Sequence, residues 1–456
     1  MSSWPGNPRD AREFRYGACG YDPASGEATL RYYLDDGPEL VERLVFPHAP
    51  WPLEASRQAA FEQALVVLHL IAGVSYYKAA VPPHVRFGKP GLAEGLPAFL
   101  REVFVQGLAE FAYVNRLDVA ARYAPESVPE FRPSPRELLL PRRALVAMGG
   151  GKDSLVGLDL LRRAGIEVQP ICIGSSSLIA ATVRETGLPL LQILRHLAPE
   201  LAALNTAGAW NGHVPVTAIN SAIAVCAAIL YGFHYVVFSN ERSADEATLI
   251  TAQGTAVNHQ YSKTTAFERE FRRIIHTVIS PDIDYFSILR PFSELEIVRR
   301  FSRLTRFHDV YSSCNRNFHQ LGQAVAGRWC GNCPKCRFAA LSLAVFLGPR
   351  QVLQIQGVDL LDDPAQMEGF RALCGLGVDK PFECVGESGE SRVALAALEQ
   401  REEWSRHAVV KGLAPALRSV AVPDMDDLMR ASSRHFIPAE IMAALPGEFE
   451  IANRGA

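Results

Sequence analysis

The residues that could do chemistry in this chain begin with "GGGKDS", Gly149 to Ser154. Bare glycine N–H groups at the start of a helix bind phosphate oxygens, because the backbone is unshielded and the helix dipole favours negative charge. Lys152 adds positive charge and Ser154 adds a hydroxyl donor. Asp153 is poorly suited to bare phosphate but suits Mg²⁺ that bridges phosphates. The stretch therefore predicts a site for a phosphate group and Mg²⁺ rather than an ordinary glycine turn.

Two common phosphate loops fit this stretch poorly. A Walker A loop needs Ser or Thr after Gly-Lys, and a glycine five positions earlier; Asp153 and Val146 stand there. A dinucleotide fingerprint needs a third glycine where Ser154 stands. The stretch resembles the PP-loop of the ATP pyrophosphatase superfamily, S-G-G-x-D-S, with Gly149 in place of the first serine. That resemblance implies cleavage of ATP between its α and β phosphates, which adenylates a substrate oxygen and releases pyrophosphate.

Four cysteines form a second motif, with the spacing C-x15-C-x2-C-x2-C over Cys314, Cys330, Cys333 and Cys336. Four thiolates this close suit tetrahedral Zn²⁺ in a closed, structural site. An iron–sulfur cluster and free thiols are the alternatives, although Ala340 stands where a ferredoxin pattern needs its next cysteine. The cluster resembles the zinc knuckle of 7-cyano-7-deazaguanine synthases. We interpret the remaining cysteines as core residues: Cys19, Cys172, Cys226, Cys374 and Cys384.

The elements around these motifs alternate between strand and helix. Strands are predicted at 144–148, 168–174, 188–194 and 234–240, and helices at 154–163 and 221–230. This rhythm predicts an α/β fold, a parallel sheet with helices on both faces, with ligands at the carboxyl ends of the strands. The predicted ATP-binding residues lie there: Gly149, Gly150, Gly151, Lys152, Asp153, Ser154, Gly174, Ser175, Asn240 and Glu241.

Three further segments carry many polar side chains, namely 210–221, 239–249 and 257–264. Solvated loop residues are the alternative interpretation, but 239–243 also follows a predicted strand. The candidate acid–base groups are His213, His259, Tyr261 and Lys263. The candidate substrate-binding residues are Arg242, Ser243, Asn258 and Arg316.

Three regions are expected along the chain. Residues 1–140 form an N-terminal α+β region that includes a helical pattern over 93–115, and five prolines within 123–143 predict a linker at its end. Residues 141–348 form the ATP-binding catalytic domain with the cysteine cluster. Residues 349–456 form a mixed, helical C-terminal region, for which packing and a substrate cap are equally open roles.

Composition narrows the class of protein. The 456 residues are 48% hydrophobic and 21% charged, as in ordinary globular proteins. A net charge of −3 gives no field that attracts nucleic acid or an anionic membrane. The apolar stretches 64–74 and 221–238 are too short or are interrupted, and the first residues lack the apolar run of a signal peptide. We expect a cytoplasmic protein with neither nucleic acid nor membrane as a partner.

The segments "AMGGGKDSLVGL", "NGHVPVTAINS", "SNERSA", "NHQYSKT" and "CGNCPKCRFA" together resemble the MurL family. Its members are ATP-dependent epimerases that convert the terminal L-glutamate of UDP-N-acetylmuramoyl-L-alanyl-L-glutamate to D-glutamate. The resemblance implies an acyl-adenylate, ATP with Mg²⁺, a structural Zn²⁺, and recognition of the UDP-muramoyl group by residues 1–140. It also implies a functional link to the ligase that adds L-glutamate to UDP-muramoyl-L-alanine in peptidoglycan precursor biosynthesis.

Other functions remain open at the level of the sequence. A PP-loop enzyme can pass its adenylated oxygen to a different acceptor, as in amide- or nitrile-forming ligases and tRNA sulfur transferases. Sulfur transfer predicts a catalytic thiol pair or an iron–sulfur cluster and an RNA-binding surface, and the net charge counts against the latter. A nucleotide sensor without catalysis is the third class.

Overall fold

The structure is a computed structural model that describes residues 4, 6–250, 254, 256–318, 327–377 and 381–449. The first residues of the segment tested for a signal peptide, 1–3 and 5, lie outside the described residues, as do 319–326 within the run between Cys314 and Cys330.

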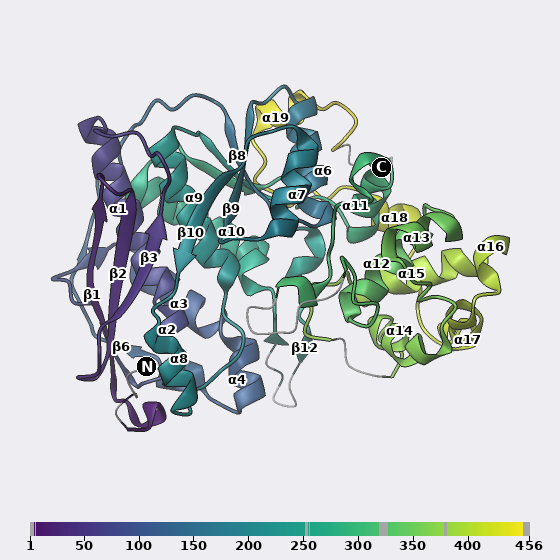
Figure 1. The fold of residues 1–456 in the computed structure, drawn as a ribbon, viewed down its shortest axis with the longest axis horizontal. Helices are drawn as coiled ribbons and strands as arrows, with labels where there is room; N and C mark the ends of the chain where they lie inside the picture. The colour runs from purple at the N-terminus through teal and green to yellow at the C-terminus, as the bar shows by residue number, and fades with distance from the viewer. Residues whose placement is uncertain are drawn as a thin grey trace, which may run out of the picture.

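One ten-stranded sheet runs through the molecule, in the order β14-β11-β8-β9-β10-β3-β2-β1-β4-β6 (Figure 1). Its strands are β1 (Glu13–Asp22), β2 (Glu27–Leu34), β3 (Leu40–Val45), β4 (His84–Arg86), β6 (Ala124–Pro125), β8 (Ala144–Ala147), β9 (Val168–Ile173), β10 (Leu191–His196), β11 (Tyr235–Phe238) and β14 (Asp284–Ser287). Strands β14, β11, β8, β9 and β10 are mutually parallel. The sequence predicted a parallel sheet that includes β8, β9, β10 and β11, whereas β14 lies outside the four predicted strands.

The N-terminal strands continue the same sheet. β10 pairs with β3 in antiparallel fashion, and β3, β2 and β1 form an antiparallel meander. β4 and β6 then extend the edge in parallel with β1. The fold is therefore a mixed α/β fold with one large, mainly parallel sheet, and residues 1–140 and 141–348 both contribute strands to it.

Helices cover both faces of the sheet. In β8, Leu145 belongs to one hydrophobic core, whereas Ala144 and Val146 belong to the other, because successive side chains of a strand point to opposite faces. The first core includes residues of α1 (Ala55–Ala72), α3 (Leu96–Val105), α9 (Val216–Tyr231) and α10 (Thr265–Ile274). The second includes residues of α6 (Lys152–Arg163), α7 (Ser177–Thr186), α11 (Glu294–Phe301) and α12 (Pro334–Ala344).

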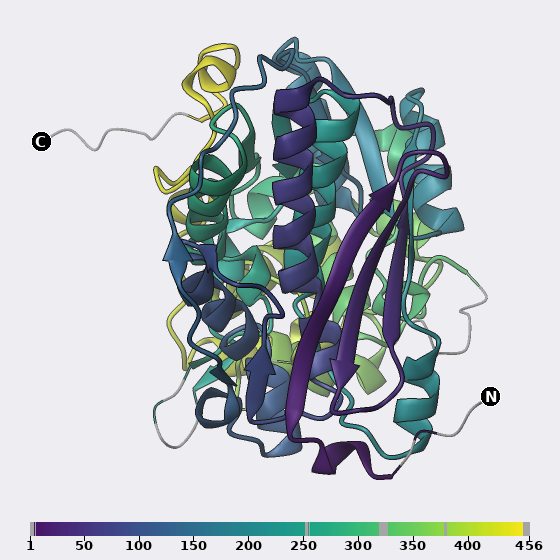
Figure 2. The ribbon, with the colours of Figure 1, turned by 90° about the vertical axis from the view of Figure 1, so that its left-hand side faces the viewer.

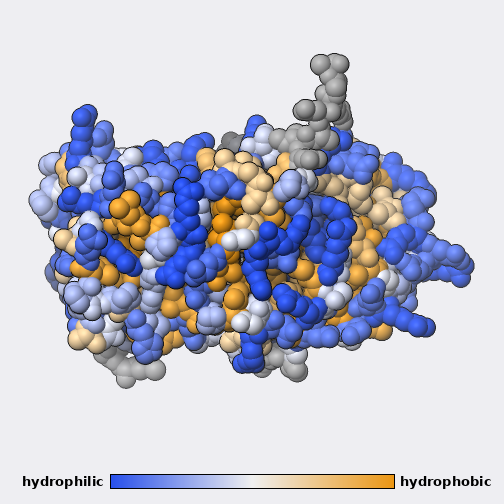
Figure 3. Space-filling model, turned by 90° about the horizontal axis from the view of Figure 1, so that it is seen from above, coloured by the Kyte–Doolittle hydropathy of each residue, from blue (hydrophilic) through white to orange (hydrophobic). Residues whose placement is uncertain are grey.

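Helix α1 is long and apolar. The stretch Ala55–Tyr77, which joins α1 to the short α2 (Val74–Tyr77), is the one helix among the described residues that is long and apolar enough to span a membrane. Of its most apolar window, 78% is buried, and α1 packs against α9 and β1 (Figure 2). Burial within the protein accounts for its composition. Seen from above, hydrophilic residues cover much of the surface, with hydrophobic patches between them (Figure 3).

Some predicted boundaries differ from the structure. The helical pattern over 93–115 forms two helices, α3 and α4 (Ala109–Asn115), with Gly107 between them. A side chain at Gly107 would come within 2.2 Å of the Val103 carbonyl oxygen. β10 begins at Leu191 and not at 188, and Pro189 just before it has no N–H to donate to a neighbouring strand.

The C-terminal region is helical and packs beyond α11. α12 contacts three of its helices, and α15 contacts α17. The helices are α13 (Pro349–Gln356), α14 (Met367–Leu373), α15 (Ser388–Glu399), α16 (Glu402–Ser405), α17 (Ala408–Leu417), α18 (Met425–Met429) and α19 (Ala439–Ala443). Figure 1 shows α12 to α17 grouped at the end of the molecule opposite β1 and β2.

Candidate active site

The glycine loop lies where the strand order of the parallel sheet reverses. The chain passes from β8 to β9 on one side and reaches β11, on the other side of β8, only after β10. The carboxyl ends of β8 and β11 therefore open a crevice, the usual ligand position in open α/β sheets. Residues 148–151 leave β8 there, and residues 239–241 leave β11. Two of the predicted ATP-binding segments thus meet at one edge.

The backbone of the glycine loop has the form of a phosphate cradle. Gly150 has φ +75°, a left-handed conformation that favours glycine. Gly151 is the N-cap of α6, and among the described residues no side chain caps that helix. A Cβ at Gly149 would meet open space. The first N–H groups of α6 are therefore free to bind an anion, which fits the triphosphate of ATP.

Lys152 is buried just inside this loop. Its Nζ lies 2.5 Å from Asp153 Oδ1 and 2.5 Å from Glu294 Oε2, and its side chain is 9% exposed. Burial by itself lowers the pKa of Lys152, but the two carboxylates outweigh it and hold the ammonium charged. Burial raises the pKa of Glu294, and Lys152 opposes that shift. Sequence reasoning missed Glu294, since the first turn of a helix commonly holds an acidic residue.

A cavity of about 70 Å³ opens beside Lys152. Its lining comes from well-separated parts of the chain: Lys152, Asp153, Glu241, Lys263, Glu294, Ser313, Lys335, Phe338, Ala339 and Cys384. Three carboxylates line it, and carboxylate oxygens are ligands that Mg²⁺ prefers. The donor set therefore fits a magnesium ion near Asp153, the residue predicted to bind it.

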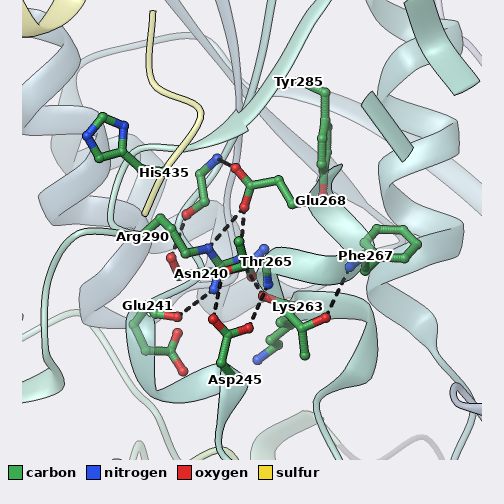
Figure 4. A network of polar contacts seen from close by, with 12 residues as sticks. Asn240, Glu241, Asp245, Lys263, Thr265, Phe267, Glu268, Tyr285, Arg290 and His435 are labelled. Atoms are coloured by element: carbon green, nitrogen blue, oxygen red, sulfur yellow. Dashed lines mark hydrogen bonds and ion pairs between the residues drawn. The ribbon is translucent and has the colours of Figure 1, made fainter. Parts of the chain in front are cut away.

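Arg290 braces the loops behind this cavity (Figure 4). It is 1% exposed and pairs with Glu268 at 2.9 Å. Its other N–H groups donate to the carbonyls of Glu241 (2.8 Å) and Lys263. Ser287 Oγ donates to the Asn240 carbonyl at 2.5 Å. These buried bonds fix the loop after β11 against the loop that carries Lys263.

Lys263 belongs to a connected group of ionisable side chains. Its Nζ lies 3.2 Å from Cys384 Sγ. His259 shares a hydrogen bond with the same sulfur and another, through Nδ1, with Glu110 Oε2. The ring of His213 lies 4.5 Å from that of His259, and its Nδ1 is 3.5 Å from Glu110 Oε2. Of the four predicted acid–base residues, three therefore lie together.

The pKa values of the ionisable side chains in this group are shifted from their ordinary values. Burial raises the pKa of Cys384, but Lys263, Lys335 and His259 outweigh it and lower the value to about 6. Burial lowers the pKa of His259, but its bonds to Cys384 and Glu110 raise it to about 9. Burial and the neighbouring His259 lower the pKa of His213 to about 4. At neutral pH the arrangement is a thiolate between an imidazolium and an ammonium.

The Glu110, His213 and His259 ligand atoms lie within 4.8 Å of one another, which is close enough for a metal site. Glu110 and His259 are, however, in direct hydrogen-bond contact. Two ligands of one ion stand about 3 Å or more apart with the metal between them. The geometry therefore favours proton transfer at these residues over metal binding.

The prediction that Cys384 is a core residue is wrong. Cys172, Cys226 and Cys374 are buried, but Cys384 is partly exposed and lines the cavity, and Cys19 is half-buried on β1. No motif surrounds Cys384, so only tertiary contacts reveal its surroundings. The same holds for Glu110. Lys335 lies within the cysteine motif, but sequence reasoning missed it too, because its place at the cavity follows only from the fold.

The other predicted catalytic residue, Tyr261, packs elsewhere. Its ring contacts Phe267 in α10, with centroids 6.0 Å apart. Burial raises the pKa of Tyr261 most, and the negative charges of Glu102 and Glu270 raise it further. It is absent from the lining of the cavity that holds Lys263, two residues further on.

The predicted substrate-binding residues have mixed surroundings. The Arg242 guanidinium donates to the carbonyls of Leu428 (2.7 Å) and Arg430 (3.0 Å), so it anchors the C-terminal region. Asn258 Nδ2 donates to the Ala244 carbonyl at 2.9 Å, and Ser243 is buried. Arg316 is exposed. Only Arg316 has its charge open to solvent.

At the end of β9, Gly174 and Ser175 complete the predicted ATP-binding set. Gly174 has φ +91° and accepts a hydrogen bond from Gln192 Nε2 at 3.0 Å. Ser175 is exposed. Both lie at the carboxyl edge of the sheet, on the β9 side of the glycine loop.

The four predicted metal-binding cysteines meet in space, with all four sulfurs within 4.8 Å of one another. Cys336 Sγ lies 3.4 Å from Cys333 Sγ and 3.8 Å from Cys330 Sγ. Tetrahedral Zn–S bonds of about 2.3 Å place sulfurs about 3.8 Å apart. The donor set therefore fits Zn²⁺.

The cysteine cluster adjoins the cavity. Lys335, between Cys333 and Cys336, lines the cavity, as does Ser313 next to Cys314. The Ser312 N–H donates to the Gly150 carbonyl at 3.2 Å. A rigid cluster would therefore hold Lys335 and the glycine loop in place.

Comparison with known proteins identifies the family. The profile described as "MurL N-terminal domain" matches residues 6–288, and that described as "MurL C-terminal domain" matches residues 310–428. A protein of Xanthomonas oryzae pv. oryzae named UDP-N-acetyl-alpha-D-muramoyl-L-alanyl-L-glutamate epimerase is 45% identical over 441 residues, which cover 96% of this chain and 98% of that protein.

Two further proteins carry the same name. The Salinispora tropica protein is 42% identical, over 90% of this chain and 89% of its own length. The protein of Micromonospora sp. is 40% identical, over 95% of this chain and 97% of its own. With a family match over most of the chain and relatives similar along its whole length, this protein belongs to the MurL family.

Proposed function

We propose that this chain epimerises the terminal glutamate of UDP-N-acetylmuramoyl-L-alanyl-L-glutamate from L to D, with conversion of ATP to AMP and pyrophosphate. The observation that carries the proposal is the single cavity in which Lys152 and Asp153 of the glycine loop face Lys263 and Cys384. The proposed nucleotide site and the proposed acid–base groups thus line one space. The names of the relatives supply the substrate.

The chemistry explains why an epimerase would use ATP. Removal of the α-proton beside a free carboxylate is difficult, because it would create a dianion. Adenylation of that carboxylate cancels its charge and turns the carbonyl into an electron sink. A base then removes the α-proton, and an acid returns one to the other face. Hydrolysis of the acyl-adenylate releases the product and AMP.

The ATP-binding residues are proposed as in the sequence analysis, with the geometry as support. The N–H groups of Gly150, Gly151 and Lys152 would bind the phosphates, with Gly174 and Asn240 just after the neighbouring strands β9 and β11. Mg²⁺ would be held by Asp153 with Glu241 and Glu294, and it would neutralise phosphate charge. The buried Lys152 ammonium would add to that neutralisation as charge develops on the leaving pyrophosphate.

The zinc proposal concerns stability. Zn²⁺ held by Cys314, Cys330, Cys333 and Cys336 would have no open position, so we assign it a structural role. It would hold the segment 312–313 and Lys335 against the cavity.

The substrate proposal places the UDP-muramoyl group outside the cavity. Residues 1–140 reach the site through Glu110 of α4, and Arg316 offers an exposed guanidinium for phosphate or carboxylate. The reaction belongs in the cytoplasm, after the ligase that adds L-glutamate to UDP-muramoyl-L-alanine and within peptidoglycan precursor biosynthesis.

The test is one incubation of the full chain with ATP, Mg²⁺ and the L-glutamate substrate in heavy water. We expect AMP, pyrophosphate and a D-glutamate product that carries deuterium at its α-carbon. The product configuration is read by chiral chromatography after acid hydrolysis. If no AMP forms, or if the α-carbon keeps its hydrogen, the proposal fails.

A further inference from the structure

Cys384 stands where three distant segments of the chain meet. Lys263, which lies just before α10, places its Nζ 3.2 Å from the Cys384 sulfur. His259 shares a hydrogen bond with it and is held in turn by Glu110 of α4. Cys384 itself comes from the stretch just before α15. The N-terminal, central and C-terminal regions therefore each supply part of this group.

The contacts of the neighbouring residues fix the backbone around Cys384. Val385 is buried in the second hydrophobic core. The Glu383 carboxylate accepts a hydrogen bond from Asn315, and a side chain at Gly386 would meet Phe338 at 2.5 Å. These contacts hold the segment in place. The hydrogen bonds of the sulfur are instead with the ionisable side chains of Lys263 and His259.

The sulfur also lies beside the activation chemistry. Cys384 and Lys263 line the same cavity of about 70 Å³ as Lys152 and Asp153. A carboxylate that reacts at the glycine loop therefore brings its α-carbon, one bond away, within reach of the opposite lining. A base at that position must be deprotonated and held in place, and Lys263 and His259 both contact the Cys384 sulfur.

We propose that Cys384 is the catalytic group that exchanges a proton with the glutamate α-carbon on one of its two faces, with Lys263 and the His259–Glu110 pair as its positioning residues. This assignment rests on the proposed function and names a residue for it. It excludes His259 itself as the group in contact with the α-carbon, since His259 acts through the sulfur.

The proton balance is closed. The Cα–H bond breaks as an S–H bond forms, and the C–H electron pair moves onto the carbonyl oxygen of the activated glutamate as an enolate. A solvent water then donates a proton to the opposite face of the enolate, and its O–H electrons stay on oxygen as hydroxide. The thiol gives its proton to that hydroxide, which restores the thiolate and the water.

The charge state of the group suits this role. A pKa of about 6 for Cys384 leaves the thiolate present at neutral pH, near the value that general-base catalysis favours. A buried thiol without these partners would be protonated.

The experiment measures, in the full chain, how much proton exchange at the α-carbon accompanies each AMP formed. Cys384→Ser is incubated with ATP, Mg²⁺ and either epimer in heavy water, and α-deuterated product is counted per AMP formed. We expect this ratio to fall about 100-fold or more with at least one epimer, because general acid–base groups contribute about that much. Cys19→Ser, another partly exposed cysteine, is the matched control and keeps the wild-type ratio.

Several outcomes overturn the assignment. A wild-type ratio in Cys384→Ser with both epimers does so, and so does a folded variant that loses AMP formation and epimerisation in equal proportion. If the Cys384→Ser variant does not fold, the wild-type protein is alkylated with iodoacetamide instead. The same fall in the ratio is expected once mass spectrometry shows that Cys384 is modified. Wild-type protein that makes no AMP would refute the proposed function instead.

The positioning residues have their own readout. His259→Gln should shift the acidic limb of the pH profile of the ratio to higher pH. Cys384→Ser should instead lower the ratio at every pH. An unchanged profile in His259→Gln would contradict the positioning role.

Discussion

At the scale of single residues, Cys384 and His259 have pKa values displaced in opposite directions, to about 6 and about 9. Since the pKa of Cys384 is depressed, its thiolate persists as pH falls until about 6 and is lost below that. Between these values both partners are charged. The reactive form of the cysteine and its cationic neighbour therefore coexist across neutral pH.

The first prediction follows from that window. We expect the iodoacetamide reaction of Cys384 to rise with a midpoint near pH 6, whereas an ordinary cysteine has a midpoint near 8.5. Lys263→Met should move the midpoint upward, because Lys263 is the largest charge that lowers it. Rates come from peptide mass spectrometry over pH 5 to about 10.

Cys19 serves as the internal reference in the same digest. Burial raises its pKa, so its modification should begin only above the ordinary midpoint. Coincident pH curves for the two cysteines would show that Cys384 is an ordinary thiol.

At the scale of elements, the glycine loop and its helix make the second prediction. Gly150 and Gly165 flank α6 and both have left-handed φ, +75° and +72°. Alanine at either position should cost roughly 1–2 kcal/mol of stability. Only Gly150→Ala should also lower ATP turnover about tenfold or more, because it displaces the cradle. Urea unfolding and AMP release measure the two effects.

Gly165→Ala is the control for the loss of stability alone. Equal turnover in the two variants would mean that the loop does not hold the nucleotide.

The start of α12 provides the third prediction. Cys333 caps this helix by accepting a bond from the Cys336 N–H at 3.4 Å. Serine is a strong N-cap residue, so Cys333→Ser keeps the cap while it removes a thiolate. Wild-type protein should contain one zinc per chain, and Cys333→Ser should lose it with about 3 kcal/mol or more of stability.

Metal content is read by plasma mass spectrometry and stability by thermal unfolding. Cys374→Ser, a buried cysteine outside the cluster, should keep its zinc. Retention of full stability by metal-free Cys333→Ser would refute a structural zinc.

Sequence reasoning succeeded for elements and failed for contacts between them. The alternation of apolar and polar runs predicted all four strands from 144 to 240, because local side-chain pattern decides which segment becomes a strand. The glycine loop was predictable because its residues are adjacent in the chain. Cys384, Glu110 and Glu294 were not, since each acquires its role only from residues more than 100 positions away.

At the scale of the whole molecule, a buried ion pair joins the two halves of the sheet. Arg195 of β10 donates to both oxygens of Glu42 on β3, at 2.7 and 3.2 Å, and Tyr76 donates to the same carboxylate at 2.9 Å. Glu42 is fully buried. The pair lies at the seam between residues 1–140 and the parallel strands.

The fourth prediction tests whether the molecule unfolds as one unit. Glu42→Ala should lower the free energy of unfolding by about 3–5 kcal/mol, because it leaves Arg195 buried and unpaired. Unfolding should occur in one transition, with the same midpoint by fluorescence and by circular dichroism. Glu27→Ala, which breaks an exposed pair with Arg43, should cost less than about 1 kcal/mol.

Two separate transitions, or a Glu42→Ala variant as stable as Glu27→Ala, would contradict this view. In the first case the N-terminal strands would form an independent unit despite the shared sheet.

The pairing of β3 with β10 has a consequence for synthesis on the ribosome. β3 can pair with β2 as soon as β3 has been made. The other edge of β3 pairs with β10, whose residues 191–196 are made much later. Ribosomes add roughly 5–20 residues per second, so this edge waits on the order of ten seconds. An unpaired apolar strand edge is a template for aggregation. Nascent chains that stop before β10 should therefore depend on chaperones, and those that extend beyond it should not.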